Sequence, residues 1–124
     1  MSALNQLIFL EKDARDFGFD WDDVHSAIDW TISECEEVRD AIVNKSSTNH
    51  IQEEVGDLIQ MTISLCLYLG FDVDETLEKT AQKFKKRMDS LKEITAEKGL
   101  QSLKGQPTEF MLELWQQAKK RTEA

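Results

Sequence analysis

The sequence predicts an all-α fold of four or five helices in a single domain spanning residues 1–124. Apolar residues recur three and four positions apart over long stretches, and no segment shows the alternating pattern of a strand. One proline and five glycines leave few breaks between those stretches. A length of 124 residues suits one ordinary domain, and 40% hydrophobic with 31% charged residues is typical of a globular protein.

The few breaks in the chain separate the expected helices. Gly18 follows an apolar N-terminal segment, and the polar residues 44–49 form a turn. Gly70 suits a helix C-terminus and Asp72 the next N-cap, while Pro107 suits a first helical turn. After the N-terminal segment, the expected helices therefore cover about 22–44, 49–69, 73–97 and a last stretch from Pro107 through Lys120.

The net charge of −9 limits the classes of partner. With 24 acidic against 15 basic residues, the chain lacks the basic surface that a nucleic acid polymer or an anionic membrane requires. Neither is expected as a partner. The surplus of carboxylates has two interpretations, a solvated acidic surface or a set of ligands for a metal ion.

The cysteines and the apolar runs bear on the compartment. Cys35 and Cys66 are too few for a disulfide scaffold and form no C-x-x-C motif. The acidic residue Glu11 interrupts the first apolar segment too soon for a signal peptide. The most apolar run, 58–71, is too short to span a bilayer. These observations predict a cytoplasmic protein.

Two pairs of acids, each three residues apart, are distinguished by their position. Glu34 and Glu37 lie near the end of the expected helix 22–44, and Glu54 and Asp57 near the beginning of the next helix. Residues three apart share a helix face, and helices joined by a short turn are antiparallel neighbours. The hairpin therefore brings four carboxylates to about the same height, where their repulsion favours a bound cation. Oxygen-only ligands favour Mg²⁺, with Mn²⁺ as the alternative ion.

A di-iron site is the competing kind of metal centre in a helical bundle. It requires Glu-x-x-His on facing helices. His25 follows Asp22 and His50 follows Ser47 at that spacing, so neither histidine completes the motif. Both are expected to be surface or cap residues.

The spacing of apolar residues also predicts which helix faces form the core. On helix 22–44 the expected stripe is Val24, Ile28, Thr31, Cys35, Val38 and Ile42, and on helix 49–69 it is Ile51, Val55, Leu58, Ile59, Thr62 and Cys66. On helix 73–97, Lys83 and Arg87 flank the core stripe. Beside a carboxylate quartet this basic pair suits a triphosphate; cations that only pass the edge of a core are the alternative.

These residues resemble those of the MazG-type nucleoside triphosphate pyrophosphohydrolases, within the all-α NTP pyrophosphatase superfamily. The family's metal pattern, E-x-x-E followed after a loop by E-x-x-D, corresponds to Glu34-Cys35-Glu36-Glu37 and Glu54-Val55-Gly56-Asp57. The segment Lys83-Phe84-Lys85-Lys86-Arg87 and the tail Trp115-Gln116-Gln117-Ala118-Lys119 follow in the family's order. The similarity covers about residues 17–120.

The resemblance implies a MazG-like bundle that hydrolyses a nucleoside triphosphate between the α and β phosphates, as nucleotide-pool housecleaning. Glu34, Glu37, Glu54 and Asp57 match the Mg²⁺ ligands. Glu34 or Glu37 would also orient the attacking water or accept its proton. Monophosphate and pyrophosphate are the expected products.

The resemblance also implies how the substrate is held. Lys83 and Arg87 match positions that contact the phosphates, and Trp115 and Lys119 match a C-terminal segment that closes over the substrate. Taken alone, Trp115 is better interpreted as a core anchor for the last helix. The family pairs its helical hairpins, which predicts a homodimer or a higher homo-oligomer.

Several positions depart from the family's usual pattern. Trp30 and Ser33 stand where a Lys and an extra Glu are common, and Ser64, Leu67 and Ala81 replace polar or basic residues. The acids are intact while the surrounding shell is changed. One alternative is therefore a non-catalytic module that keeps the fold and metal site and binds nucleotides or a partner. Another is an acidic helical interaction protein whose stability Mg²⁺ does not affect.

Overall fold

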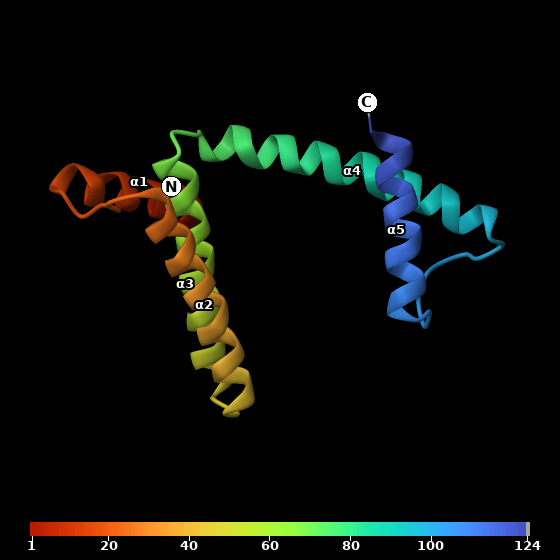
Figure 1. The fold of residues 1–124 in the computed structure, drawn as a ribbon, viewed down its shortest axis with the longest axis horizontal. Helices are drawn as coiled ribbons and strands as arrows, with labels where there is room; N and C mark the ends of the chain where they lie inside the picture. Colours follow the sequence, from red (N-terminus) through yellow and green to blue (C-terminus); the bar gives the residue numbers. More distant parts are fainter. Residues whose placement is uncertain (124) are drawn as a thin grey trace. The chain divides into compact units, whose positions relative to one another are not determined.

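Residues 1–123, the part described by the computed structural model, contain five helices and no strand, which confirms the all-α prediction. The helices are α1 (Ala3–Phe17), α2 (Val24–Val43), α3 (Thr48–Tyr68), α4 (Val73–Glu97) and α5 (Thr108–Thr122) (Figure 1). The limits predicted for α2 to α5 agree with these to within two residues. Within the same residues, none of the helices combines the length and apolar character needed to cross a membrane.

Capping side chains explain why the helices begin and end where the sequence predicts. The side chains of Asp23 and Ser47 accept hydrogen bonds from the backbone N–H groups of Ser26 and His50, at 2.8 and 3.1 Å. Each bond satisfies a donor that has no partner inside its helix. α1 ends at Gly18, whose φ of +104° lies in the left-handed region that residues with a Cβ atom avoid.

The contacts divide the chain into two compact units, residues 1–75 and 76–123, and each is described by itself. The first unit contains α1, α2, α3 and the start of α4. α2 and α3 run antiparallel side by side, as the green and orange ribbons of Figure 1 show, and α1 packs against α3. The predicted antiparallel hairpin is therefore present.

The faces that pack within the hairpin differ from the predicted apolar stripes. On α2 the buried apolar side chains are Ala27 and Ala41, whereas Ile28 and Ile42 are 39% and 56% exposed. On α3, Ile59 of the predicted stripe is 52% exposed. The stripe predictions were wrong at these positions. They gave most weight to large apolar residues, whereas two helix axes approach closely where the side chains between them are small.

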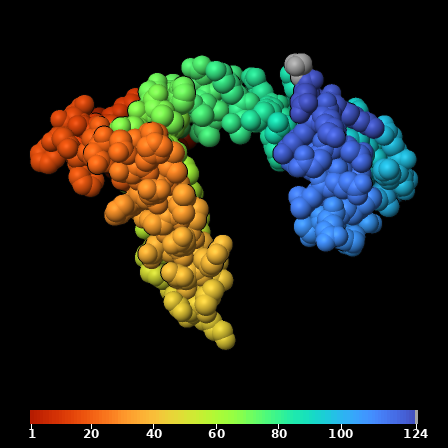
Figure 2. Space-filling view, in the orientation of Figure 1, coloured from red at the N-terminus to blue at the C-terminus, as the bar shows by residue number. Residues whose placement is uncertain are grey.

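The second unit is formed by α5 packing across the C-terminal part of α4 (Figure 2). Its buried core consists of Leu91, Ile94, Leu114 and Ala118. Arg121 on α5 binds Glu97 on α4 through two hydrogen bonds of 3.0 and 2.8 Å. α5 is thus held on α4 by an apolar cluster and by one exposed ion pair.

Candidate functional site

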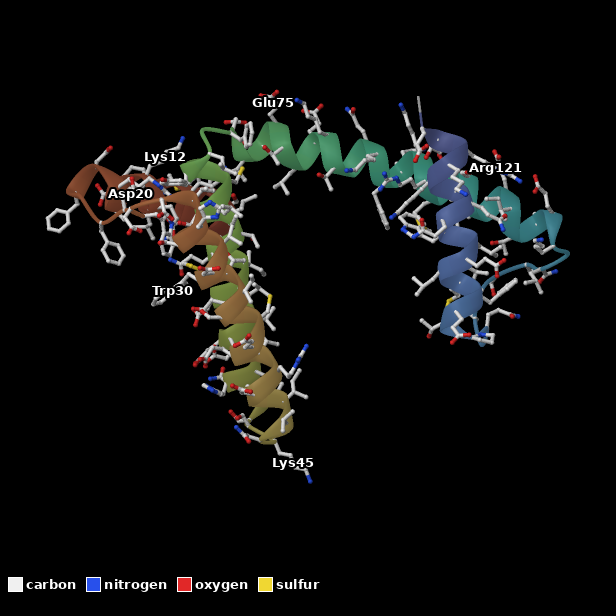
Figure 3. All side chains as sticks on the ribbon, viewed as in Figure 1. Lys12, Asp20, Trp30, Lys45, Glu75 and Arg121 are labelled. Atoms are coloured by element: carbon white, nitrogen blue, oxygen red, sulfur yellow. The ribbon has the colours of Figure 1, made fainter. Side chains whose placement is uncertain are left out.

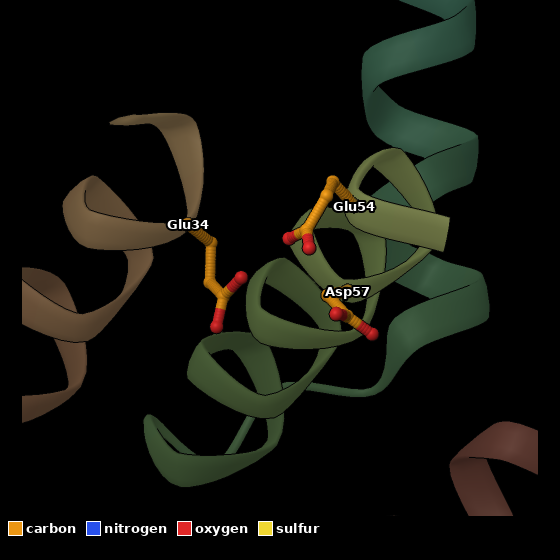
Figure 4. Close-up of side chains that lie close together, drawn as sticks. All are labelled: Glu34, Glu54 and Asp57. Carbon is orange, nitrogen blue, oxygen red and sulfur yellow. The ribbon is translucent and has the colours of Figure 1, made fainter. Parts of the chain in front are cut away.

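Three of the four predicted metal ligands meet in the hairpin. Glu34 on α2 faces Glu54 and Asp57 on α3 (Figure 4), and one carboxylate oxygen from each lies within 4.8 Å of the other two. Two ligands that each lie about 2.1 Å from one Mg²⁺ ion are at most about 4.2 Å apart, so small side-chain rotations would complete the contact. The three groups offer only oxygen, which is the ligand chemistry of a hard cation. The residues fit a Mg²⁺ or Mn²⁺ ion.

The surroundings of Glu34 disfavour its negative charge. Partial burial, followed by the charge of Asp57, raises the pKa of the Glu34 carboxyl above its ordinary value. A hydrogen bond with Trp30 acts in the opposite direction, and the charges of Glu54 and Glu37 raise the pKa further. Like charges in a partly desolvated space have this effect, and a cation placed among them would cancel it.

Glu34→Gln should therefore stabilise the protein when divalent ions are absent. Because the pKa of Glu34 is raised in the folded state, its protonated form favours folding below about pH 4.5. That contribution is lost as the pH rises through the folded-state pKa. At pH 7 in a chelator, we expect the variant to melt about 2 °C higher than the wild type, by differential scanning calorimetry.

At pH 3.5 the same two proteins should melt within about 1 °C of each other, because the glutamate is then neutral as well. Glu36→Gln, which changes an exposed acid on the same helix, is the matched control. It should leave the melting temperature unchanged at both pH values. An equal stabilisation by Glu34→Gln at both pH values would contradict this electrostatic account.

Glu37 lies outside the cluster of three. It is exposed on α2, three residues beyond Glu34, and its charge still acts on Glu34. Its predicted role as a direct ligand stays a prediction. An acid at this position can also act on a water molecule next to the cluster.

His50, in the first turn of α3, lies close to one of the clustered carboxylates. Its backbone N–H donates to Oγ of Ser47, so Ser47 and not His50 is the cap residue of this helix. Its side chain, however, places Nε2 3.5 Å from Oε1 of Glu54. The four-residue spacing of the two side chains was the sequence signal for this contact.

A cavity of about 520 Å³ opens beside the carboxylates, entirely within the first unit. It is lined by α1, the loop at 18–23, α2 and α3. Trp30 and Asp20, labelled in Figure 3, contribute to its lining, and so does Met61. Trp30 precedes Glu34 by four residues on α2, and Met61 follows Asp57 by four on α3. Since the helices are antiparallel, both steps, each about 6 Å, lead to the same end of the hairpin.

A network of polar side chains joins α1 and the following loop to α3 at this cavity. Arg15 donates to the backbone oxygen and to Oγ of Ser64, at 2.6 and 2.9 Å, and to a carboxylate oxygen of Glu11 at 3.3 Å. Trp21 Nε1 also donates to Ser64 Oγ, at 3.0 Å. Gln60 Nε2 donates to the other oxygen of Glu11, at 2.9 Å. The cavity wall is therefore held in place by hydrogen bonds between distant parts of the chain.

The four predicted substrate-binding residues all lie in the second unit. Lys83 is exposed and Arg87 half-buried on α4, while Trp115 and Lys119 are half-buried on α5. Trp115 packs against the core of that unit, and its ring centroid lies 5.9 Å from that of Phe84. Trp115 thus packs as a core anchor for α5, which is the interpretation that this residue suggests when it is taken alone. A contact of these four residues with substrate stays a prediction.

A family comparison decides how the carboxylate cluster is to be interpreted. The model of the MazG nucleotide pyrophosphohydrolase domain matches residues 22–91, a stretch that includes all four predicted metal ligands together with Lys83 and Arg87. The chain belongs to the MazG family. The resemblance inferred from the sequence is thereby confirmed.

Relatives of this MazG chain occur among curated bacterial proteins. The nucleoside triphosphate pyrophosphohydrolase of Escherichia coli strain K12 is 32% identical over 97% of this chain and 46% of its own length, and that of strain O157:H7 gives the same values. The nucleoside triphosphate pyrophosphohydrolase/pyrophosphatase MazG of Thermotoga maritima is 29% identical over 94% of this chain and 44% of its own length. The chain spans a little under half the length of these relatives.

The sequence did not point to the polar network of this MazG chain. Glu11, Arg15 and Gln60 carried no predicted role, and the first two precede the residues that the family model matches. Ser64 was singled out only as a departure from the family's usual residue. That departure was the one available signal, because each pair in the network that joins α1 to α3 is 49 residues apart.

Proposed function

We propose that this chain hydrolyses nucleoside triphosphates between the α and β phosphates, giving a monophosphate and pyrophosphate, with Mg²⁺ held by Glu34, Glu54 and Asp57. The observation that carries the proposal is the meeting of these three carboxylates between α2 and α3 in a chain of the MazG family. The names of the relatives agree with this chemistry. We assign the activity to nucleotide-pool housecleaning in the cytoplasm.

The residues of the chain divide the proposed reaction between them. A bound Mg²⁺ ion, or Mn²⁺ in its place, would supply charge for the phosphate oxygens and acidify a coordinated water. Glu34 holds the ion from α2, and either Glu34 or Glu37 orients the attacking water or accepts its proton. Glu37 suits this role because it is exposed and lies outside the cluster of three.

Basic residues of the chain are proposed to bind the pyrophosphate leaving group. Lys83 and Arg87 would neutralise charge on the departing pyrophosphate, and Trp115 and Lys119 would contact the substrate, as the resemblance implies. Trp115 holds α5 on α4 through its packing against the core cluster. It thereby positions Lys119, which lies one turn further along the helix.

The direct test is release of pyrophosphate from the common ribo- and deoxyribonucleoside triphosphates, with Mg²⁺ and with a chelator. We expect release from at least one nucleotide with Mg²⁺ and none with the chelator. Monophosphate should appear in equal amount, because the cleaved bond lies between the α and β phosphates. Orthophosphate as the first product would contradict the proposed bond.

A second candidate function is nucleotide binding without hydrolysis. The hydroxyl of Ser33 donates to the backbone oxygen of Trp30 at 2.8 Å, so this position gives its hydrogen bond to its own helix. α2 then supplies one carboxylate to the cluster and α3 supplies two. Calorimetry that shows nucleotide binding in the absence of any product would favour this candidate, and turnover gained by Ser33→Glu would explain it.

We also propose that the chain forms a homodimer or a higher homo-oligomer through its hairpin. Ile42 and Ile59 are more than half exposed, and Ile28 and Val55 are each 39% exposed. These large apolar side chains, exposed on both helices of the hairpin, provide surface that an interface would bury.

Ile59→Glu should weaken self-association at least tenfold, because it places a charge on that apolar surface. Sedimentation equilibrium measures the change. Gln52→Glu, an exposed position of the same helix, is the matched control and should leave association unchanged. A wild-type chain that sediments as a monomer at every concentration would contradict the proposal.

A further inference from the structure

We propose that the cavity beside the carboxylate cluster takes the base of the nucleotide and selects bases that carry an exocyclic amino group. Cytosine, adenine and guanine would then be preferred over their oxo counterparts uracil, hypoxanthine and xanthine. This inference rests on the proposed function for the position of the phosphates at the cluster. It adds the substrate class, which neither the family nor the carboxylates specify.

The size and the walls of the cavity suit a flat ring. Its volume of about 520 Å³ lies within the usual range for small-molecule pockets. Trp21 and Trp30 line it with ring centroids 6.1 Å apart and ring planes inclined by 52°, and Met61 and Leu10 add flexible apolar surface. Aromatic side chains offer such faces to the π-face of a base, whichever base it is.

The position of the cavity fits a nucleotide whose phosphates lie at Glu34, Glu54 and Asp57. Trp30 and Met61 mark the near edge of the cavity, one helical turn from Glu34 and Asp57. A step of four residues corresponds to about 6 Å along the helix axis. A ribose bridges a gap of that order between phosphate and base. The base therefore enters the cavity while the phosphates stay at the cluster.

The hydrogen-bond donors of Arg15 and Trp21 at the cavity are either bonded within the protein or buried. The terminal nitrogens of Arg15 donate to Ser64 and to Glu11, and its Nε lies 3.4 Å from Asp20. Trp21 Nε1 donates to Ser64. A guanidinium has five N–H groups and an indole has one. The four N–H groups on the terminal nitrogens of Arg15 are bonded within the protein, and the fifth, on Nε, is buried without a hydrogen-bond partner among the described residues. The indole N–H of Trp21 is bonded as well, so neither side chain exposes a donor to a ligand.

Acceptors, by contrast, remain at the α1 side of the cavity. Each carboxylate oxygen of Glu11 receives one hydrogen bond, although a carboxylate can accept about four. Gln60 must direct its Nε2 to Glu11, so its Oε1 is the atom that can accept from a ligand. An exocyclic amino group can donate a hydrogen bond to these oxygens. An oxo group is itself an acceptor, so it would face them without a hydrogen bond.

Calorimetric titration with the α,β-methylene analogues of CTP and UTP tests this preference, because the analogues bind without being cleaved at the proposed bond. We expect the cytidine analogue to bind the wild type about tenfold more tightly, which is a modest effect for a hydrogen bond to a charged group. Gln60→Met keeps the side-chain volume and removes an acceptor, so it should lower this ratio. Glu11→Gln should lower it further, because it turns one acceptor into a donor.

Lys12→Gln is the matched control, since Lys12 is exposed beside Glu11 on α1 and lines no part of the cavity. It should keep the wild-type ratio. If Glu11→Gln does not fold, the comparison of variant with wild type uses Gln60→Met alone. A parallel comparison of pyrophosphate release from ATP and ITP should show the same preference for the amino base in kcat/KM.

Equal affinities for the two analogues, a preference for uridine, or no binding of either would overturn the inference. A ratio that Gln60→Met and Glu11→Gln both leave unchanged would overturn it too. None of these outcomes decides the proposed function, because that depends on the release of pyrophosphate from the nucleotide panel. A chain that cleaves CTP and UTP equally well keeps its activity and loses only the base preference.

Discussion

Asp57→Asn should lower the rate of pyrophosphate release by about 10²- to 10³-fold, the usual cost of removing one group that stabilises charge in a transition state. Asp57 shares the cluster with Glu34 and Glu54, and an amide offers a neutral oxygen where the ion needs a charged one. The loss should be mainly in kcat at saturating nucleotide. A steady-state assay of pyrophosphate over a range of Mg²⁺ concentrations measures it, and more Mg²⁺ should restore part of the rate.

Glu36→Gln is the matched control for this variant, because Glu36 is exposed on α2 and is not among the clustered acids. It should retain at least half of the wild-type rate. Circular dichroism should show that Asp57→Asn keeps its helices, since the exposed side chain of Asp57 makes no core contact. Full activity of Asp57→Asn at limiting Mg²⁺ would contradict the assignment of the metal centre.

Arg15→Met should destabilise the first unit by about 3 kcal/mol, because it leaves the buried carboxylate of Glu11 without its positive partner. The same change removes two donors from Ser64, which is 3% exposed and has few other groups to bind. Urea denaturation followed by tryptophan fluorescence measures the free energy of unfolding. Trp21, which binds the same Ser64, should become more exposed before the helices unfold.

Lys12→Met provides the comparison, since Lys12 is exposed three residues before Arg15 on the same helix. It should change the free energy of unfolding by no more than about 0.5 kcal/mol. The double variant Arg15→Met with Glu11→Gln should regain part of the loss, because no buried charge is then left unpaired. Equal destabilisation by the single and double variants would contradict the ion-pair explanation.

The helices and the carboxylates could be predicted because local spacing specifies them. Asp23 and Ser47 cap α2 and α3 through bonds to residues three positions ahead, so the helix starts are encoded within a few residues. The short turn between the two helices makes them antiparallel neighbours. That relation, together with the three-residue spacing in Glu54 and Asp57, is sufficient to place both opposite Glu34.

The remaining features depend on contacts that local spacing does not encode. The burial of Ala27 and Ala41 in place of Ile28 and Ile42 is decided by how closely α2 approaches α3. The cavity depends on Arg15 reaching Ser64 across 49 residues. A helical wheel describes one helix at a time, so it cannot show which neighbour a side chain will meet.

The placement of one acid on α2 and two on α3 has a mechanical consequence. An ion held by Glu34, Glu54 and Asp57 would tie together two helices that otherwise are joined by one turn and pack side by side. It acts as a removable cross-link, and it shortens the stretch of chain that can open independently to residues 35–53. In the proposed enzyme, chelation would therefore loosen the end of the hairpin as well as stop the chemistry, and the availability of magnesium would affect the lifetime of the fold.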